Sequence, residues 1–106
     1  MEKITVIGES CLDEFVYCNT NRLSPEAPVP VLVPEHTVRT SGMAGNVKRN
    51  LEVLTRTTNV KLITQFETIT KTRYIDEKSN HMFLRVDNKV ELEPTIVCDS
   101  FLAEHL

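Results

Sequence analysis

The sequence predicts an α/β fold with a βαβ-type core and a second, smaller β-sheet. Two short β-branched runs, Ile4–Ile7 and Asn59–Thr64, flank a helical pattern, as the strands of a parallel crossover unit do. Alternating apolar residues recur at Phe15–Tyr17, Val29–Val33 and Met82–Val86. Because such alternation is typical of half-buried strands, these three runs predict a small sheet distinct from the core strands.

The N-terminal third of the chain predicts three strands. Ile4–Ile7 ends at Gly8 and has the apolar character of a buried strand, for which a parallel sheet is preferred. Glu14–Tyr17 predicts a second strand that places Phe15 and Tyr17 on one face. The proline-rich stretch Ser24–Pro30 forbids a helix and favours an extended connection. The following strand, Val29–Val33, contains Pro30 and is followed by Pro34, so it is expected to be an edge strand or an interrupted one.

The helical pattern is expected to begin near Ala44 and to end near Arg56. Val47, Leu51 and Leu54 recur at i, i+4 and i+7, which is typical of an amphipathic helix. The strand Asn59–Thr64 follows and completes the crossover unit.

The C-terminal third predicts a hairpin and a final helix. The strand-like runs Lys71–Asp76 and Met82–Asp87 are joined by the polar, turn-forming segment Glu77–Asn80. The segment Pro94–Leu106 is expected to form a helix with Thr95 near its N-cap.

Composition and charge restrict the classes of partner. The 106 residues are 41% hydrophobic and 25% charged, as in a small globular domain or part of a larger one. Twelve basic and fifteen acidic residues give a net charge of -3, which argues against nucleic acid as the main partner. No apolar run approaches the roughly 20 residues that span a bilayer, and the N-terminus does not resemble a signal peptide. We therefore expect a cytoplasmic chain with no membrane partner.

Neither the cysteines nor the histidines suggest a metal site. The cysteines form no CxxC pair, which makes a disulfide framework or a zinc cage improbable, and we interpret them as structural or incidental. The histidines are far apart in sequence and are expected at the surface. The residues concerned are Cys11, Cys18, Cys98, His36, His81 and His105.

Three constellations could bind a ligand, and each has an ordinary structural alternative. In the first, Gly8–Asp13, carboxylates follow a buried strand, where open α/β sheets bind ligands. Asp13 could accept hydrogen bonds from two sugar hydroxyls, although a solvated loop would contain the same residues.

In the second constellation, Gly42–Asn46, two glycines precede a helix. Gly42 and Gly45 would let a ligand approach the backbone, and Asn46 could both donate to and accept from a hydroxyl. The alternative is an ordinary helix entry, because the pattern matches no established phosphate-binding loop.

The third constellation lies on the expected hairpin. Lys71 and Arg73 share a strand face, with Arg85 and Asp87 on the partner strand. The basic groups could clamp a sugar phosphate, and cross-strand ion pairs on a solvated face are at least as plausible.

These segments together resemble the start of PfkB-type (ribokinase-like) sugar kinases. The resemblance rests on Gly8–Phe15, Arg22–Val31 and Gly42–Val47, and Arg22–Pro30 is its most specific part. Within the family, the stretch is most similar to the kinase domain of bifunctional heptose 7-phosphate kinase and ADP-heptose synthase enzymes. Thr70–Arg73 and Leu84–Asp87 also resemble later strands of that domain.

The resemblance implies a partial ribokinase-like, Rossmann-like core with a small β-sheet lid, formed by segments about 13–38 and 70–88. Residues 1–106 would then be a truncated N-terminal portion of the kinase domain. The resemblance implies that Asp13, Gly42 and Asn46 bind the sugar. With the candidates from the second and third constellations, the expected substrate-binding residues are Asp13, Gly42, Gly45, Asn46, Lys71, Arg73 and Arg85. The implied partners are a sugar or sugar phosphate, and either a second copy through the lid or a missing C-terminal half.

The chain also departs from the family pattern. Glu9, Met43 and Lys48 replace an aspartate, a glycine and a small residue, and only Phe66–Ile69 remains where the family has a further helix and strand. The chain has three glycines, Gly8, Gly42 and Gly45, none of which is arranged as in the family's late Gly-x-Gly-Asp motif, and the ATP half of the fold is missing. ATP and Mg²⁺ are expected for the full-length family, but we expect no catalytic residue, cofactor site or metal site in this chain.

Three hypotheses therefore remain open. The chain is a shortened relative of a heptose 7-phosphate-type kinase that keeps the sugar site and lid, and is inactive alone. Alternatively, it is a non-catalytic sugar-binding or dimerisation module built on the lid sheet. The third hypothesis is a decayed or truncated gene product without a stable function.

Overall fold

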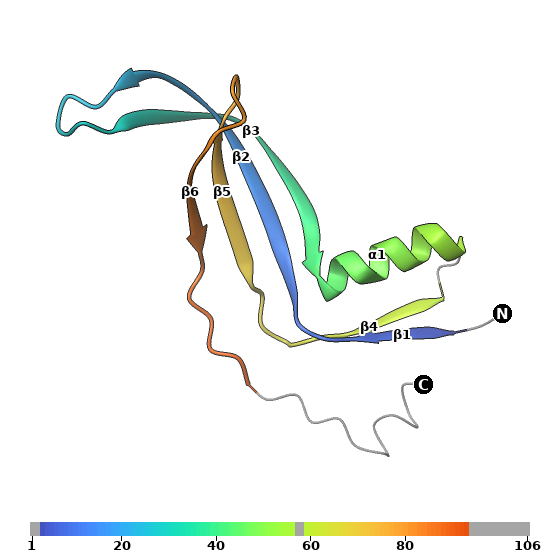
Figure 1. Ribbon diagram of the computed structural model, residues 1–106. Helices are drawn as coiled ribbons and strands as arrows, with labels where there is room; N and C mark the ends of the chain where they lie inside the picture. The colour runs from blue at the N-terminus through green and yellow to red at the C-terminus, as the bar shows by residue number, and fades with distance from the viewer. Residues whose placement is uncertain (1–2, 57–58, 94–106) are drawn as a thin grey trace. The chain divides into compact units, whose positions relative to one another are not determined.

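The computed structural model describes residues 3–56 and 59–93 (Figure 1). The helix expected at 94–106, together with Cys98 and His105, lies outside the described residues. The described elements are β1 (Ile4–Ile7), β2 (Ser10–Leu23), β3 (Pro30–Met43), α1 (Ala44–Thr55), β4 (Val60–Ile63), β5 (Thr70–Asp76) and β6 (Met82–Asp87).

The chain divides into two compact units. The first unit includes the described residues among 1–12, 41–69 and 89–106, and the second consists of residues 13–40 and 70–88. The second unit overlaps the segments that the family resemblance implies for the lid, whose role we take up under the proposed function.

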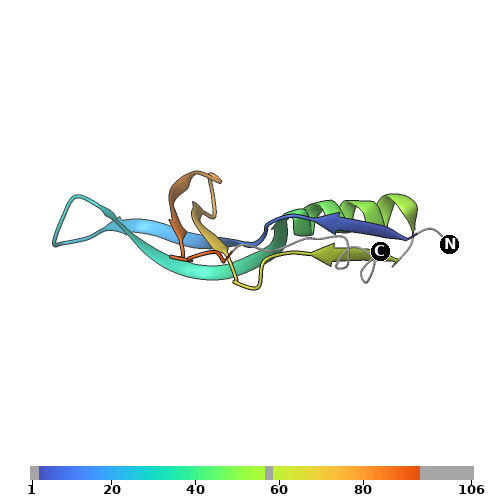
Figure 2. The same ribbon diagram turned by 90° about the horizontal axis from the view of Figure 1, so that it is seen from below.

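The first unit contains the expected parallel strands and helix. β1 pairs with β4 in parallel, with Ile4 opposite Val60 and Ile7 opposite Ile63. Val60 and Ile63 are buried in this pairing, and α1 packs along the two strands (Figure 2). The two β-branched runs therefore pair as expected, because pairing against the helix removes part of their apolar surface from water.

Helix α1 has the expected limits, but its apolar stripe is only partly covered. Its C-cap is Arg56, a non-glycine residue in the left-handed region with φ 52°. Leu51 is half-buried, whereas Val47 is 48% exposed and Leu54 is 80% exposed. A two-stranded sheet is too narrow to cover a helical stripe of this width, so part of the stripe remains on the surface of this unit.

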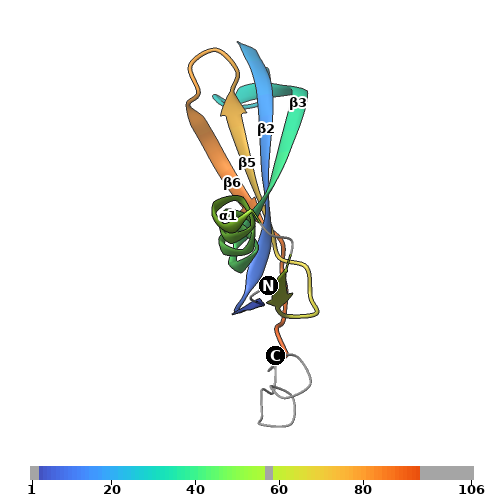
Figure 3. The ribbon, with the colours of Figure 1, turned by 90° about the vertical axis from the view of Figure 1, so that its right-hand side faces the viewer.

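The second unit is a four-stranded sheet with the order β3-β2-β5-β6 (Figure 3). β3 lies at an edge, as its prolines predict. β2 begins at Ser10 and β3 continues to Met43, so both strands are longer than expected. Both strands extend into polar stretches with a weak preference for strand structure, because hydrogen bonding to neighbouring strands keeps these stretches extended.

The predicted hairpin joins β5 and β6. The strands are antiparallel, with Lys71 opposite Asp87, and a register shift falls between Tyr74 and Ile75. The turn is closed by Asp76, whose Oδ2 accepts hydrogen bonds from Ser79 Oγ at 2.6 Å and Ser79 N at 3.1 Å. These bonds from Ser79, with smaller contributions from Lys78 and Thr20, hold the pKa of Asp76 below its ordinary value.

Among residues 3–56 and 59–93, no helix combines the length and apolar character needed to cross a membrane.

Candidate functional site

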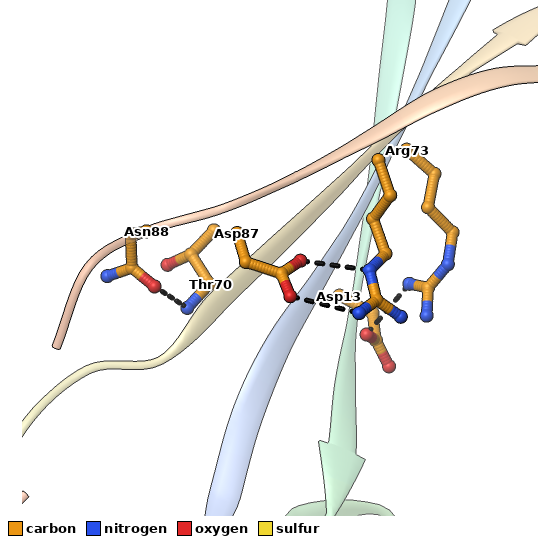
Figure 4. Close-up of polar contacts among 6 residues, drawn as sticks. Asp13, Thr70, Arg73, Asp87 and Asn88 are labelled. Carbon is orange, nitrogen blue, oxygen red and sulfur yellow. Dashed lines mark hydrogen bonds and ion pairs between the residues drawn. The ribbon is translucent and has the colours of Figure 1, made fainter.

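Asp13 and Arg73 form an ion pair on the four-stranded sheet. Because β2 begins at Ser10, Asp13 lies within a strand and not in the loop that the sequence allowed. Arg73 Nη1 donates to Asp13 Oδ1 at 2.9 Å, and the two side chains are 25% and 21% exposed (Figure 4). The pair therefore joins the carboxylate expected to bind sugar hydroxyls to one of the cations expected to bind phosphate.

The cross-strand register brings further charges beside this pair. Arg85 lies opposite Arg73, and Lys71 lies opposite Asp87. The guanidinium of Arg85 binds the Asp87 carboxylate twice, through Nε and Nη2, each at 3.0 Å. Since alternate residues of a strand share a face, three cations and two carboxylates occupy one face of the sheet. We call these five residues, Asp13, Lys71, Arg73, Arg85 and Asp87, the charged cluster.

The ion pairs anticipated as the structural alternative for the hairpin are thus present. They connect β5 to β2 and lie within β6, whereas the sequence suggested pairing across the hairpin. The other interpretation of these residues, in which Lys71, Arg73 and Arg85 bind a sugar phosphate, stays a prediction.

Phe15 is a member of this face that the sequence argument did not assign to the site. It lies two residues after Asp13 on β2, and the guanidinium carbon of Arg73 lies 5.3 Å from its ring centroid. The alternation of Asp13, Phe15 and Tyr17 along one strand was the available signal, since it places all three on the same face.

The second constellation surrounds the start of α1, in the first unit. Gly42 is buried at the end of β3, while Gly45 and Asn46 lie in the first helical turn. A Cβ added at Gly45 would lie 3.2 Å from the Cβ of Ser41, so this position has little room for a side chain. Asn46 is exposed and lines a hollow along α1 with Arg49, Asn50, Val53 and Leu54.

The helix entry has an unusual backbone at Met43, with φ 55° and ψ -129°. This region is favourable for glycine and strained for other residues. The N–H of Ala44 donates to the Glu9 carbonyl at 2.9 Å, which fixes the entry against the segment after β1. The first turn has no acidic residue and no side-chain cap.

Asp13 and the Gly42–Asn46 group belong to different units. Each unit is described by itself, so the expected convergence of Asp13 and Asn46 on one ligand stays a prediction.

The cysteines and histidines that the structure describes are either buried or half-buried thiols or exposed rings in contact with an aromatic side chain. Cys11 and Cys18 are not joined in a disulfide, and Cys18 is fully buried. His36 is exposed and stacks on Tyr17 with ring centroids 4.7 Å apart, while His81 is exposed beside Phe83. In the part of the chain that the structure describes, no three His, Cys, Asp or Glu side chains are grouped so that they could hold a metal ion.

Comparisons with known proteins bear on this geometry. No family model matches the chain. A "Bifunctional protein HldE" from Rhodopseudomonas palustris (strain HaA2) is 35% identical over 97 residues, covering 91% of this chain and 18% of the relative. A protein of the same name from Caulobacter sp. (strain K31) is 49% identical over 51 residues, which are 48% of this chain and 10% of the relative.

A solved structure supports the same relationship at the level of fold. A carbohydrate kinase from Agrobacterium tumefaciens matches 83% of this chain and 36% of its own, with a TM-score of 0.54 and 16% identity. The fold is thus consistent with a partial ribokinase-like core, as the sequence predicts. The chain spans a small part of its relatives' length, and over most of its own length the predicted resemblance is confirmed.

Proposed function

We propose that this chain, a relative of bifunctional HldE proteins and of carbohydrate-kinase lineage, binds a phosphorylated sugar through the charged cluster. The observation that carries the proposal is the Asp13–Arg73 ion pair with Arg85 opposite Arg73. A carboxylate accepts hydrogen bonds from sugar hydroxyls, and a guanidinium donates two parallel bonds to a phosphate. By lineage, the proposed ligand resembles heptose 7-phosphate.

The roles within the cluster follow from its charges. Lys71, Arg73 and Arg85 carry three positive charges against two carboxylates, which leaves a formal excess of one. Two arginines placed opposite each other repel, and a bound phosphate would relieve that repulsion. Asp13 would bind a hydroxyl of the same ligand.

We further propose that Gly42, Gly45 and Asn46 bind sugar hydroxyls in the first unit. The first turn of α1 has neither a side-chain cap nor an acidic residue, and such a turn suits an electron-rich ligand group. The amide of Asn46 is exposed and can donate and accept.

The proposed role of the second unit is that of a lid over the sugar, with phosphoryl transfer absent from this chain alone. Phosphoryl transfer depends on positioning of the nucleotide and on stabilisation of the transferred charge. The 106 residues contain three glycines, at positions 8, 42 and 45, which cannot form the Gly-x-Gly-Asp motif of the family.

Isothermal titration of the 106-residue chain tests the binding proposal. Ribose 5-phosphate is expected to bind more tightly than ribose, and Arg73→Gln is expected to abolish most of that difference. Asp13→Ala should weaken ribose binding by about 1–3 kcal/mol, as expected for loss of a hydrogen-bonded charged group. The same variant leaves the Arg73 guanidinium in place and should therefore retain measurable binding of inorganic phosphate.

A matched control is available on the same sheet. Arg39 Nε pairs with Glu14 Oε2 at 3.0 Å, and Glu14 points to the opposite face from its neighbour Asp13. Arg39→Gln removes the same charge and should leave both affinities unchanged. Equal affinity for ribose and ribose 5-phosphate, or equal losses in Arg73→Gln and Arg39→Gln, would contradict the proposal.

A second candidate function is a non-catalytic dimerisation module built on the same sheet. It is favoured by the apolar side chains of β6, because Leu84 and Val86 are 45% and 49% exposed and share a strand face. Analytical ultracentrifugation at high micromolar concentration should then show a dimer, and Leu84→Lys should dissociate it. A monomeric wild-type chain at that concentration would exclude this function.

A further inference from the structure

Phe15 lies against the guanidinium group of Arg73, a contact that the proposed function does not use. The distance of 5.3 Å between the guanidinium carbon and the ring centroid is within the range of a cation–π interaction. Phe15 comes from β2 and Arg73 from β5, which are neighbours in the sheet. The contact therefore ties together the two central strands of the second unit.

The environment of Arg73 restricts its guanidinium from two directions. Asp13 accepts from Nη1 at 2.9 Å, and the guanidinium carbon lies over the ring of Phe15. Arg85, held by Asp87 through two bonds, lies opposite on β6. An arginine side chain has several rotatable bonds, and repulsion from a facing arginine would drive it toward solvent. The ring and the carboxylate together oppose that motion.

We infer that Phe15 is a positioning residue that holds the guanidinium of Arg73 ready to bind a phosphate group together with Arg85. The inference rests on the proposed function, since it concerns the same charged cluster. A guanidinium that is already oriented loses less conformational entropy when it binds an anion, and the affinity for the anion is therefore higher. Phe15 does not touch the phosphate, so its effect is exerted entirely through Arg73.

The consequence is a requirement for an aromatic ring at position 15. Leucine would keep an apolar side chain on the sheet but would lose the electron-rich ring face that attracts the cation. An exposed to partly buried cation–π contact corresponds to about a three- to tenfold change in affinity. Tyrosine would keep the ring and the contact.

Isothermal titration calorimetry of the 106-residue chain with inorganic phosphate tests the inference. Phe15→Leu is expected to weaken phosphate binding about three- to tenfold, and Phe15→Tyr to retain wild-type affinity. The matched control is Tyr17→Leu, which removes a ring two residues along the same face. Tyr17 stacks on His36 and not on Arg73, so this variant should bind phosphate as the wild-type chain does.

The outcomes separate the inference from the proposed function. Saturable binding by the wild-type chain with unchanged affinity in Phe15→Leu would overturn the role of Phe15 alone. Equal losses in Phe15→Leu and Tyr17→Leu would also overturn it, because they would indicate a general effect on the sheet. Absence of phosphate binding by the wild-type chain would overturn the charged cluster as a phosphate site, and the inference with it.

A second variant covers the case in which Phe15→Leu does not fold. Arg73→Lys preserves the positive charge but lacks the planar group that lies against the ring. It is expected to weaken phosphate binding at least threefold, while Lys78→Arg, which preserves the charge of an exposed residue in the β5–β6 turn outside the charged cluster, should not weaken it. Wild-type affinity in Arg73→Lys would overturn the inference, because a point charge would then suffice.

Discussion

The side-chain amide of Gln65 binds both backbone polar groups of Ser10. Its Oε1 accepts from Ser10 N at 2.9 Å, and its Nε2 donates to Ser10 O at 2.7 Å. On either side, Gly8 N donates to Ile63 O at 3.1 Å and Leu12 N donates to Ile69 O at 2.8 Å. The side-chain amide of Gln65 thus makes the two hydrogen bonds with Ser10 that a backbone peptide group of a neighbouring strand would make. It does so just after β4 ends at Ile63. It satisfies backbone groups beside the short connection Phe66–Ile69.

Replacing this amide by a carboxylate is expected to destabilise the chain. Gln65→Glu loses the donor to Ser10 O and places a negatively charged acceptor beside that carbonyl. We expect the free energy of unfolding to fall by about 1–3 kcal/mol, the cost of unpaired polar groups that are partly buried. Urea denaturation followed by circular dichroism measures the change. Asn50→Asp makes the same chemical change on the exposed surface of α1 and should alter stability by less than about 0.5 kcal/mol.

Met43→Gly is expected to stabilise the chain. Met43 occupies a backbone region, φ 55° and ψ -129°, in which a non-glycine residue costs of order 1–3 kcal/mol. Glycine removes that strain but gains freedom in the unfolded chain worth about 0.5–1 kcal/mol, so a net gain of about 1 kcal/mol is expected. For a domain of this size the gain corresponds to a rise of about 4–8 °C in Tm.

Met43→Ala is the control for this prediction. Alanine removes most of the side chain but keeps the Cβ that makes the backbone conformation costly. A rise in Tm for glycine with none for alanine is the expected pattern. Equal shifts in the two variants would show that the methionine side chain, and not the backbone, is responsible.

Cys18 is expected to make the stability of the chain fall at alkaline pH. Burial raises the pKa of the Cys18 thiol above its ordinary value of 9.0, and the charge of Glu35 acts in the same direction. The unfolded chain therefore releases this proton first as the pH rises. The contribution to stability is fully present below about pH 9 and is lost as the pH rises through the folded-state pKa.

Chemical denaturation between pH 7 and pH 10.5 tests this dependence. Cys18→Ala should lower stability at pH 7 through the lost packing, but should flatten the decline above pH 9. Cys11→Ala, which removes a half-buried thiol from the same strand, should decline as the wild-type chain does. A decline of equal steepness in Cys18→Ala and wild type would exclude Cys18 as its source.

The purified 106-residue chain is expected to produce no ADP from ATP. A missing general base often costs about 10²–10⁴-fold in rate, and loss of the groups that stabilise the transferred phosphate costs more. Magnesium neutralises phosphate charge but does not position a nucleotide. A coupled assay with ATP, magnesium and heptose 7-phosphate, ribose or glucose should match the no-protein control. Turnover that persists after removal of host kinases and disappears in Asp13→Ala would contradict this prediction.

The sequence by itself determined the elements whose patterns are local. The β-branched runs at Ile4–Ile7 and Asn59–Thr64 paired in parallel, and the i, i+4, i+7 spacing located α1 to within a residue at its C-terminal end. The prolines placed β3 at a sheet edge, and the polar turn at Glu77–Asn80 predicted the β5–β6 hairpin. Each of these features depends on the period of the side chains, on turn-forming residues or on the fixed backbone of proline, which a single segment reveals.

The tertiary structure decided which distant residues became partners. The sequence placed Lys71 and Arg73 on one face, but it did not show that the Arg73 guanidinium would meet Asp13, sixty positions earlier, or the ring of Phe15. It did not reveal the double contact of Gln65 with Ser10 or the strained backbone of Met43. These features arise from strand order and register, which depend on the sum of many weak contacts across the sheet and leave no local pattern in the residues that they join.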